Sequence, residues 1–286
     1  MASSYSLNST IKLNNGVLMP RIHLGVYMTS GRETRSAVTH ALNAGYRAID
    51  SAEWYANEAE VGSSVLAFLE SPENTSRRTR GDLWFTTKLK ENRSYAATRT
   101  SIRASIQRSG LGYLDLYLLH SPYGGKKARR ECWRAVEDAV DEGEVRAGGV
   151  SNFGVKHLRE LISASPRTLP AVNQIEVHPF NTRTDITSVC AAHGIVVEAY
   201  APLARARRFR HPTVVRASEE LGCTPAQLLV RWSLQHGYVP LPKSVSRERI
   251  EANADVDGFE IGEESMEALD GCDEYLVTDW DPTHCD

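Results

Sequence analysis

The sequence lacks the features that mark membrane, secreted and disulfide-bonded proteins. No stretch approaches the roughly 20 apolar residues that span a bilayer, and residues 1–5 have neither the basic nor the apolar region of a signal peptide. The 5 cysteines form no Cys-x-x-Cys pair, and their odd number predicts free thiols in a reducing compartment. We therefore expect a cytoplasmic protein without a membrane partner.

An excess of positive charge is also missing. The formal net charge is −3, so no global field attracts nucleic acid, and none is expected as a partner. The short basic runs at 126–127 and 129–130 are predicted to be solvated faces, whereas the run at 205–210 is left open between a solvated face and a ligand contact. Cys190 and His193 have the spacing of metal ligands, but nothing nearby supplies two more, so no metal site is predicted.

Two phosphate-binding fingerprints are absent as well. No G-x-G-x-x-G follows a predicted strand and no G-x-x-x-x-G-K-[ST] occurs, which disfavours an open nucleotide-binding sheet. The chain instead repeats a unit in which a short β-prone run ends in polar residues and a helical pattern follows. The predicted strands are 46–50, 83–88, 114–120, 145–151, 172–177, 196–200 and 239–243, with a weak eighth at 253–256. The clearest predicted helices are 33–43, 96–107, 129–141 and 224–236.

Strands that alternate with helices imply parallel pairing through right-handed crossovers. A closed barrel of this kind needs roughly 250 residues, and the chain has 286 with no Gly/Ser/Pro-rich linker to divide it. We expect an α/β fold, a (β/α)8 TIM barrel that occupies residues 1–286 as a single domain. Residues 11–19, which turn at Asn-Asn-Gly, are predicted to form a β-hairpin that caps the bottom of the barrel.

Polar residues end the predicted strands, and a parallel barrel brings these ends to one face. They are Asp50, Lys88, His120, Ser151, Asn152, Tyr200 and Lys243. A tyrosine holds its proton at neutral pH, and a nearby ammonium stabilises the phenolate and lowers the tyrosine pKa. The ammonium itself needs a carboxylate when it is buried, and an imidazole can orient a carbonyl. Such a set protonates a carbonyl without a metal, and the hydride then comes from a nicotinamide cofactor.

Seven segments in a fixed order resemble the aldo-keto reductases over almost the whole chain. They are 45–52 (GYRAIDSA) with Tyr55, Asn57-Glu58 and Val61-Gly62; 86–89 (TTKL); 115–122 (DLYLLHSP); 143–146 (GEVR) with 149–153 (GVSNF); Asn173-Gln174 with His178-Pro179; 200–203 (YAPL); and 242–246 (PKSVS) with Arg249. Each segment alone is a weak signal. Together, each near the end of a predicted strand, they identify the family.

The resemblance implies a catalytic tetrad of Asp50, Tyr55, Lys88 and His120, with Tyr55 as the general acid. The implied reaction is the reduction of an aldehyde or ketone to an alcohol by NADPH, as in the NADP⁺ type of alcohol dehydrogenase. The implied cofactor contacts are Ser151, Asn152 and Gln174 at the carboxamide, Tyr200 on the ring, Leu203 near the pyrophosphate, and Lys243, Ser244, Ser246, Arg249 and Asn253 around the adenosine phosphate. An ammonium and a guanidinium suit the 2′-phosphate that only NADPH carries.

The chain departs from the family pattern near the implied pocket. His23 and Tyr27 stand where glycine and tryptophan are more usual, and a glutamate that usually contacts adenine is displaced by one position, so only Asn253 is carried over. The implied substrate contacts are Tyr27, Trp54, Tyr123 and Trp280. A short loop at 121–127 and a short tail predict an open site for bulky or polar carbonyls, and both are similar to fungal members.

Two other interpretations fit part of the sequence. Tyr123 and Lys127 match the Y-x-x-x-K pair of short-chain dehydrogenases, but that pair needs a helix and Gly124-Gly125 disfavours one. A sensor or partner subunit that binds NADPH without catalysis stays as the alternative, because fold does not determine function. We expect a monomer that acts on a small-molecule carbonyl.

Overall fold

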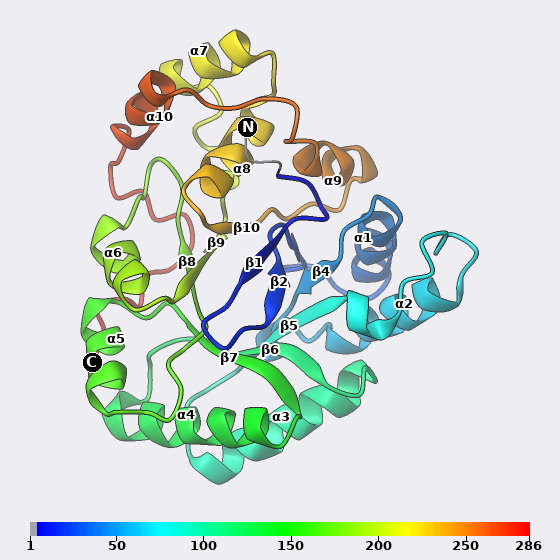
Figure 1. Cartoon of the computed structure of the whole chain (residues 1–286), viewed down its shortest axis with the longest axis vertical. Helices are drawn as coiled ribbons and strands as arrows, with labels where there is room; N and C mark the ends of the chain where they lie inside the picture. Colours follow the sequence, from blue (N-terminus) through cyan, green and yellow to red (C-terminus); the bar gives the residue numbers. More distant parts are fainter. Residues whose placement is uncertain (1–4) are drawn as a thin grey trace.

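Residues 5–286 are described by a computed structural model, in which a ring of eight parallel strands is surrounded by helices (Figure 1). The strands are β3 (Leu24–Gly25), β4 (Ala48–Asp50), β5 (Trp84–Leu89), β6 (Leu114–Leu119), β7 (Val145–Ser151), β8 (Val172–Glu176), β9 (Val196–Tyr200) and β10 (Val239–Leu241). They pair in chain order, and a parallel bridge between Gly25 and Lys243 joins the first strand to the segment after the last. The predicted (β/α)8 barrel is confirmed.

Helices follow the strands and lie outside the ring. They are α1 (Gly31–Asn43), α2 (Glu58–Glu70), α3 (Tyr95–Ser109), α4 (Gly125–Asp141), α5 (Val155–Ser163), α6 (Thr184–Ala192), α7 (Pro212–Leu221), α8 (Pro225–Gln235), α9 (Arg247–Ala254) and α10 (Glu263–Asp270). The start of α8 shows why the sequence predicted it. The Thr224 hydroxyl accepts from the Gln227 amide, and proline takes the first helical position, where no backbone donor is needed.

The predicted eighth strand at 253–256 is wrong. Asn253 and Ala254 belong to the last turn of α9, and the true eighth strand is β3, which precedes the other seven. With two residues, β3 is too short to show any period in the sequence. Its place is set by tertiary pairing, because it lies between β4 on one side and Lys243 on the other.

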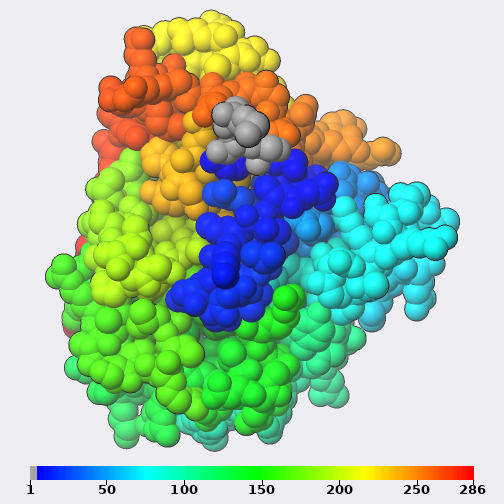
Figure 2. All heavy atoms as spheres, viewed as in Figure 1, coloured from blue at the N-terminus to red at the C-terminus, as the bar shows by residue number. Residues whose placement is uncertain are grey.

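The N-terminal hairpin is confirmed and closes the amino end of the barrel. Strands β1 (Thr10–Lys12) and β2 (Leu18–Pro20) pair antiparallel, and Leu13 and Met19 pack with Ala48, Trp84 and Leu116 from the barrel strands. The side chain of Asn14 donates to the carbonyl of Pro170, just before β8, which ties the turn to the barrel rim. Figure 2 shows the hairpin, in blue, lying over the centre of this face.

Candidate active site

The carboxyl ends of β4, β5 and β6 bring the four predicted catalytic residues together. Asp50 ends β4, Lys88 lies in β5, His120 follows β6, and Tyr55 ends the short 3-10 helix Glu53–Tyr55. Lys88 Nζ lies 2.6 Å from Asp50 Oδ1 and 3.5 Å from Tyr55 Oη. The rings of Tyr55 and His120 meet edge to face with centroids 5.8 Å apart. Residues from distant segments therefore surround one point.

Lys88 is fully buried, but its ammonium is compensated. Besides the Asp50 carboxylate, Nζ donates to the Ser51 carbonyl at 2.7 Å, and it lies 4.9 Å from the centre of the Tyr55 ring. A charge is kept inside a protein only when it is paired and hydrogen-bonded. The pair thus holds a positive charge beside the phenol hydroxyl.

The pKa of Tyr55 lies well above its ordinary value. Burial is the main cause, and the negative charge of Asp50 adds to it. This net direction is opposite to the lowering predicted from the Lys88 ammonium, because burial and the Asp50 carboxylate outweigh that one cation. Tyr55 therefore carries its proton throughout the neutral pH range.

His120 is a neutral imidazole. Burial, followed by repulsion from Lys88, lowers its pKa well below the ordinary value. Its Nδ1 atom is buried without a partner among residues 5–286. A neutral imidazole has one N–H donor, so His120 can donate a single hydrogen bond to an oxygen in the site.

A second set of polar residues lies on β7, β8 and β9, beside the tetrad. Asn152 has a φ of 60°, a left-handed conformation that asparagine tolerates. Its Nδ2 donates to the His120 carbonyl at 3.0 Å, and its Oδ1 accepts from the Tyr200 hydroxyl at 2.9 Å. The Ser151 hydroxyl donates to the Gln174 carbonyl at 2.9 Å. These are the residues implied for the nicotinamide carboxamide and ring, and the structure brings them together.

Of the five residues implied for the adenosine phosphate, four lie where β10 passes into α9, and Asn253 lies in the last turn of α9. Lys243 and Arg249 are exposed, and neither forms an ion pair within the described chain. Ser244 and Asn253 are buried. Ser246 begins α9 by accepting from the Arg249 amide, while its hydroxyl donates to Glu248 at 2.6 Å. Two free cations at a helix N-terminus suit an anion.

The basic run at 205–210 follows Leu203 and is partly tied to the C-terminal tail. Arg205 pairs with Asp279 at 3.1 Å and lies over the Tyr27 ring at 5.8 Å, and Arg208 pairs with Glu274. These pairs place the loop after β9 across the mouth of the site. The run is therefore neither a free basic patch nor a plain solvated face.

Two of the four predicted substrate contacts, Tyr27 and Trp280, adjoin the rings of Tyr55 and His120, and Tyr123 adjoins Trp280. Tyr27 lies 5.1 Å from Tyr55, and Trp280 lies 6.2 Å from His120 and 5.8 Å from Tyr123, measured between ring centroids. Trp54 differs, since its indole donates to the Lys90 carbonyl at 2.7 Å and the side chain is 57% exposed. The aromatic side chains of Tyr27, Tyr123 and Trp280 thus lie beside the site, and Trp54 lies at its outer edge.

The C-terminal tail carries Trp280 and is held against the strand ends. The Thr278 amide donates to Glu176, the last residue of β8, at 2.9 Å. Gly154 allows the close approach, because a Cβ there would lie 2.0 Å from the Thr283 carbonyl oxygen. Glu176 is not among the predicted site residues, and its signal is weaker than that of Asp50, because its strand also carries the polar residues Asn173 and Gln174.

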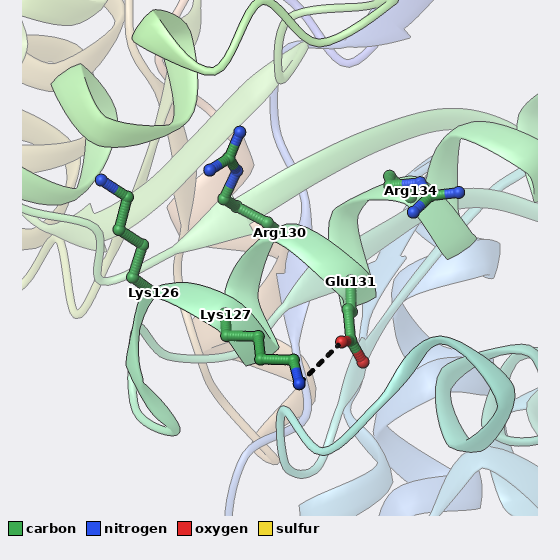
Figure 3. A pocket seen from close by; sticks show the side chains of 5 residues that line it. All are labelled: Lys126, Lys127, Arg130, Glu131 and Arg134. Atoms are coloured by element: carbon green, nitrogen blue, oxygen red, sulfur yellow. Dashed lines mark ion pairs between the residues drawn. The ribbon is translucent and has the colours of Figure 1, made fainter.

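The basic runs at 126–127 and 129–130 both fall on or beside α4. Lys126, Lys127, Arg130 and Arg134 line an outer hollow with Glu131, which pairs with Lys127 (Figure 3). For Lys126, Lys127 and Arg130, which are exposed, the predicted solvated face holds. For Arg129 it is wrong, because this side chain is buried and pairs with Glu160 at 2.8 Å. Helical period turns Arg129 inward while its neighbours face solvent.

The segment that leads into α4 is not helical at Tyr123. Tyr123 precedes α4, and Gly124 and Gly125 have φ of 99° and 79°, so Tyr123 and Lys127 do not form the helical Y-x-x-x-K pair. In the described range, no three His, Cys, Asp or Glu side chains are grouped to hold a metal. No helix within residues 5–286 has both the length and the apolar character to cross a bilayer.

The fold and the site together define a (β/α)8-barrel oxidoreductase. The chain belongs to the aldo/keto reductase family, whose model matches residues 21–274. It is 44% identical over 276 residues to an uncharacterized oxidoreductase of Schizosaccharomyces pombe, covering 96% of this chain and 98% of that protein. It is 39% identical to the glyoxal reductase of Bacillus subtilis, covering 93% of each chain.

Solved structures agree with this assignment. An aldo-keto reductase from a deep-sea metagenome library superposes with a TM-score of 0.88 at 34% identity, covering 93% of this chain and 96% of the other. The aldose reductase of Schistosoma japonicum superposes with a TM-score of 0.85 at 32% identity, covering 93% of each. The resemblance seen in the sequence is therefore confirmed at the level of the family.

Proposed function

We propose that this protein reduces an aldehyde or ketone to an alcohol, with a hydride from NADPH and a proton from Tyr55. The observation that carries the proposal is the buried Lys88–Asp50 pair with its ammonium 3.5 Å from the Tyr55 hydroxyl. A paired, desolvated cation beside a phenol has no structural need that an apolar residue would not meet as well. It does meet a chemical need, because it stabilises the phenolate that proton donation leaves behind.

The residues present fit a nicotinamide cofactor. Gln174 Nε2 donates to Asp50 Oδ2 at 2.9 Å and to Glu198 Oε2 at 2.7 Å, so only the amide oxygen of Gln174 is left to offer a ligand. An acceptor there matches the NH₂ group of a carboxamide. At the other end, Lys243 and Arg249 form no ion pair among residues 5–286 and suit a 2′-phosphate. When bound, NADPH supplies the hydride.

Each member of the tetrad then has a distinct task. His120, neutral and with one donor, orients the substrate carbonyl through a hydrogen bond to its oxygen. Tyr55 donates the proton from Oη to that oxygen, and its raised pKa ensures that the proton is present at neutral pH. Lys88 stabilises the phenolate, and Asp50 pairs with Lys88 and holds it in place. General acid catalysis of this kind contributes about 10²–10⁴-fold to a rate.

The alternative, a cofactor-binding sensor or partner subunit, makes a different prediction. We would follow NADPH oxidation with aliphatic, aromatic, sugar and polyketide-type carbonyls, and with glyoxal, since a similar protein is named a glyoxal reductase. Turnover of any of these supports the enzyme. Tight NADPH binding with no oxidation across the whole panel supports the sensor and overturns the reductase.

Cofactor choice can be tested separately from catalysis. We expect Lys243→Ala and Arg249→Ala to raise the Kd for NADPH about tenfold or more and to leave the Kd for NADH nearly unchanged, since only NADPH carries the 2′-phosphate. Arg247→Ala is a matched control, because Arg247 is exposed on the same helix and pairs with Glu251. Equal losses for both cofactors would contradict the assigned phosphate contact.

The proposal includes the working form of the protein. We propose a cytoplasmic monomer with a small carbonyl compound as its partner, and the supporting observation is that all 5 cysteines are free thiols. Light scattering of the purified protein at micromolar concentration tests the monomer, and a concentration-dependent dimer would contradict it.

A further inference from the structure

A buried carboxylate in the barrel interior takes no part in the steps above. Glu198 lies in the middle of β9 and is 0% exposed. The groups that face it come from the strands and the segment packed around it: Gln174 from β8, Asp50 from β4, Lys88 from β5, and His23 from just before β3. Its signal in the sequence is a glutamate within the otherwise apolar run 196–200, and it is not among the predicted site residues.

One atom of Glu198 and one atom of His23 face each other as acceptors, and they need a shared proton to form a hydrogen bond. His23 Nε2 lies 2.9 Å from the Pro20 carbonyl, which can only accept, so Nε2 carries a hydrogen. His23 Nδ1 then faces Glu198 Oε1 at 3.5 Å, and both atoms are buried with no other partner in the described chain. Two acceptors cannot satisfy each other, and a proton between them resolves both.

We infer that Glu198 is a protonated carboxylic acid that donates to His23, and that this neutral pair is a positioning element for the catalytic Asp50. The second part rests on the proposed function. The coupling runs through Gln174, whose NH₂ group bridges Asp50 Oδ2 and Glu198 Oε2. Burial raises the pKa of Glu198 to about 8 and lowers that of His23 to about 4, which places the proton on Glu198 at neutral pH.

The protonation state of Glu198 matters because of the charges that it adjoins. With Glu198 neutral, Asp50 is the carboxylate that balances Lys88, and the ammonium stays beside Tyr55. An ionised Glu198 adds a second negative charge within a low-dielectric interior, where charges interact strongly. That charge disfavours the Tyr55 phenolate, so Tyr55 becomes a weaker acid and reduction slows. The wild-type rate should therefore fall as Glu198 ionises.

The first test needs neither cofactor nor substrate. An infrared spectrum of protein labelled with carbon-13 glutamate should show a protonated carboxyl band at neutral pH that disappears with a midpoint near pH 8 and is missing in Glu198→Gln. Nitrogen-15 NMR should show His23 neutral, with hydrogen on Nε2. A spectrum without the glutamate acid band, or a doubly protonated His23, overturns the inference. The wild-type titration alone decides it if the variant fails to fold.

The second test is the pH dependence of carbonyl reduction. Wild-type kcat should fall up to about tenfold from about pH 7 to about pH 9, one unit above the pKa of Glu198. Glu198→Gln, whose amide can donate to His23 and accept from Gln174, should keep the rate at neutral pH and abolish the fall. Asp115→Asn is the control, since Asp115 is an equally buried carboxylate paired with Arg80 and Arg146, outside this chain of contacts.

The outcomes separate the two proposals. If the protein shows the glutamate acid band but reduces no carbonyl, the shared proton is supported and the proposed reductase function is overturned. If the protein is an active reductase and its fall in kcat at alkaline pH is the same in Glu198→Gln, the reductase function is supported and the positioning role is overturned. If Glu198→Gln lowers kcat at neutral pH as much as Asp115→Asn does, the effect of Glu198 is merely structural and the positioning role is overturned.

Discussion

The two ends of the barrel differ in what fills them. At the amino end, Leu13 and Met19 of the hairpin region pack with Ala48, Trp84 and Leu116 in an apolar plug. At the carboxyl end, the buried groups are charged or polar, and some of their atoms have no partner in the described chain. The amino end is packed like a hydrophobic core, whereas the carboxyl end keeps buried polar groups that lower the stability of the fold.

Along a single strand, the interior side chains change from apolar to charged within a few residues. Along β5, Trp84 lies in the apolar plug, Thr86 accepts from the Trp84 indole, and Lys88 pairs with Asp50. Side chains two positions apart lie on the same face of a strand, so these three face the interior in turn. The difference teaches that stability and chemistry are separated by depth in this barrel. Substitutions at the two ends should therefore have separable effects.

The largest expected effect is at the carboxyl end. Tyr55→Phe should lower kcat about 10²–10⁴-fold, because it removes the proposed proton donor and little else. NADPH affinity and the free energy of unfolding should change little, since the ring is kept. Steady-state kinetics and a denaturant titration check both. A variant that keeps most of its activity would refute Tyr55 as the acid.

The matching change at the amino end should reverse the pattern. Met19→Ala removes a fully buried side chain from the plug and should lower the free energy of unfolding by about 2–5 kcal/mol. The kcat of the folded protein should stay near the wild-type value, because the plug is remote from the tetrad. Urea unfolding and activity measured on the same preparation test this. A loss of kcat without a loss of stability would break the separation.

A smaller effect should appear in the pH dependence of stability. The pKa of Glu198 is about 8 in the folded protein and 4.5 as its ordinary value, so the folded state binds more protons between these values and stability falls as pH rises. His23, lowered from 6.5 to about 4, has the opposite sign below pH 6.5. The net fall should therefore show from about pH 6.5 to 8, at roughly 1 kcal/mol per pH unit.

Glu198→Gln isolates that contribution. Its free energy of unfolding, measured by urea titration across the same pH range, should lack this fall, whereas Asp115→Asn should retain it. Identical pH dependence in the wild-type protein and Glu198→Gln would contradict the raised pKa of Glu198.

The smallest expected effect concerns the ion pair over the mouth of the site. Arg205 and Asp279 are each about one-third exposed, so their pair should contribute only about 0.2–1 kcal/mol to stability. A double-mutant cycle with Arg205→Ala and Asp279→Asn measures it. We expect a larger effect on KM than on kcat, because the pair joins the β9 loop to the tail without touching the tetrad. A coupling energy well above this range would show that the pair is a structural lock.

Most of the barrel was predictable because its strands are short apolar runs with polar ends. Seven of the eight strands, the hairpin and the start of α8 follow from local patterns. The strand β3 did not, since pairing to β4 and Lys243 makes it a strand and no local period does. The positions of Asp50, Lys88 and His120 were also predictable, because each interrupts an otherwise apolar pattern, whereas Tyr55 was implied only by the resemblance to the family. The inward turn of Arg129 was missed where the basic run was treated as a single surface.

The sequence by itself determined the family, the parallel barrel and the set of residues at its carboxyl end, since these depend on residue types at fixed positions along the chain. Only the tertiary structure decided how those groups act on one another. Burial and Asp50 outweigh Lys88 in setting the pKa of Tyr55, and the juxtaposition of His23 with Glu198 creates a place for a proton. The reason is physical: desolvation and hydrogen-bond partners depend on which side chains meet, and residues 175 positions apart meet only in the closed barrel.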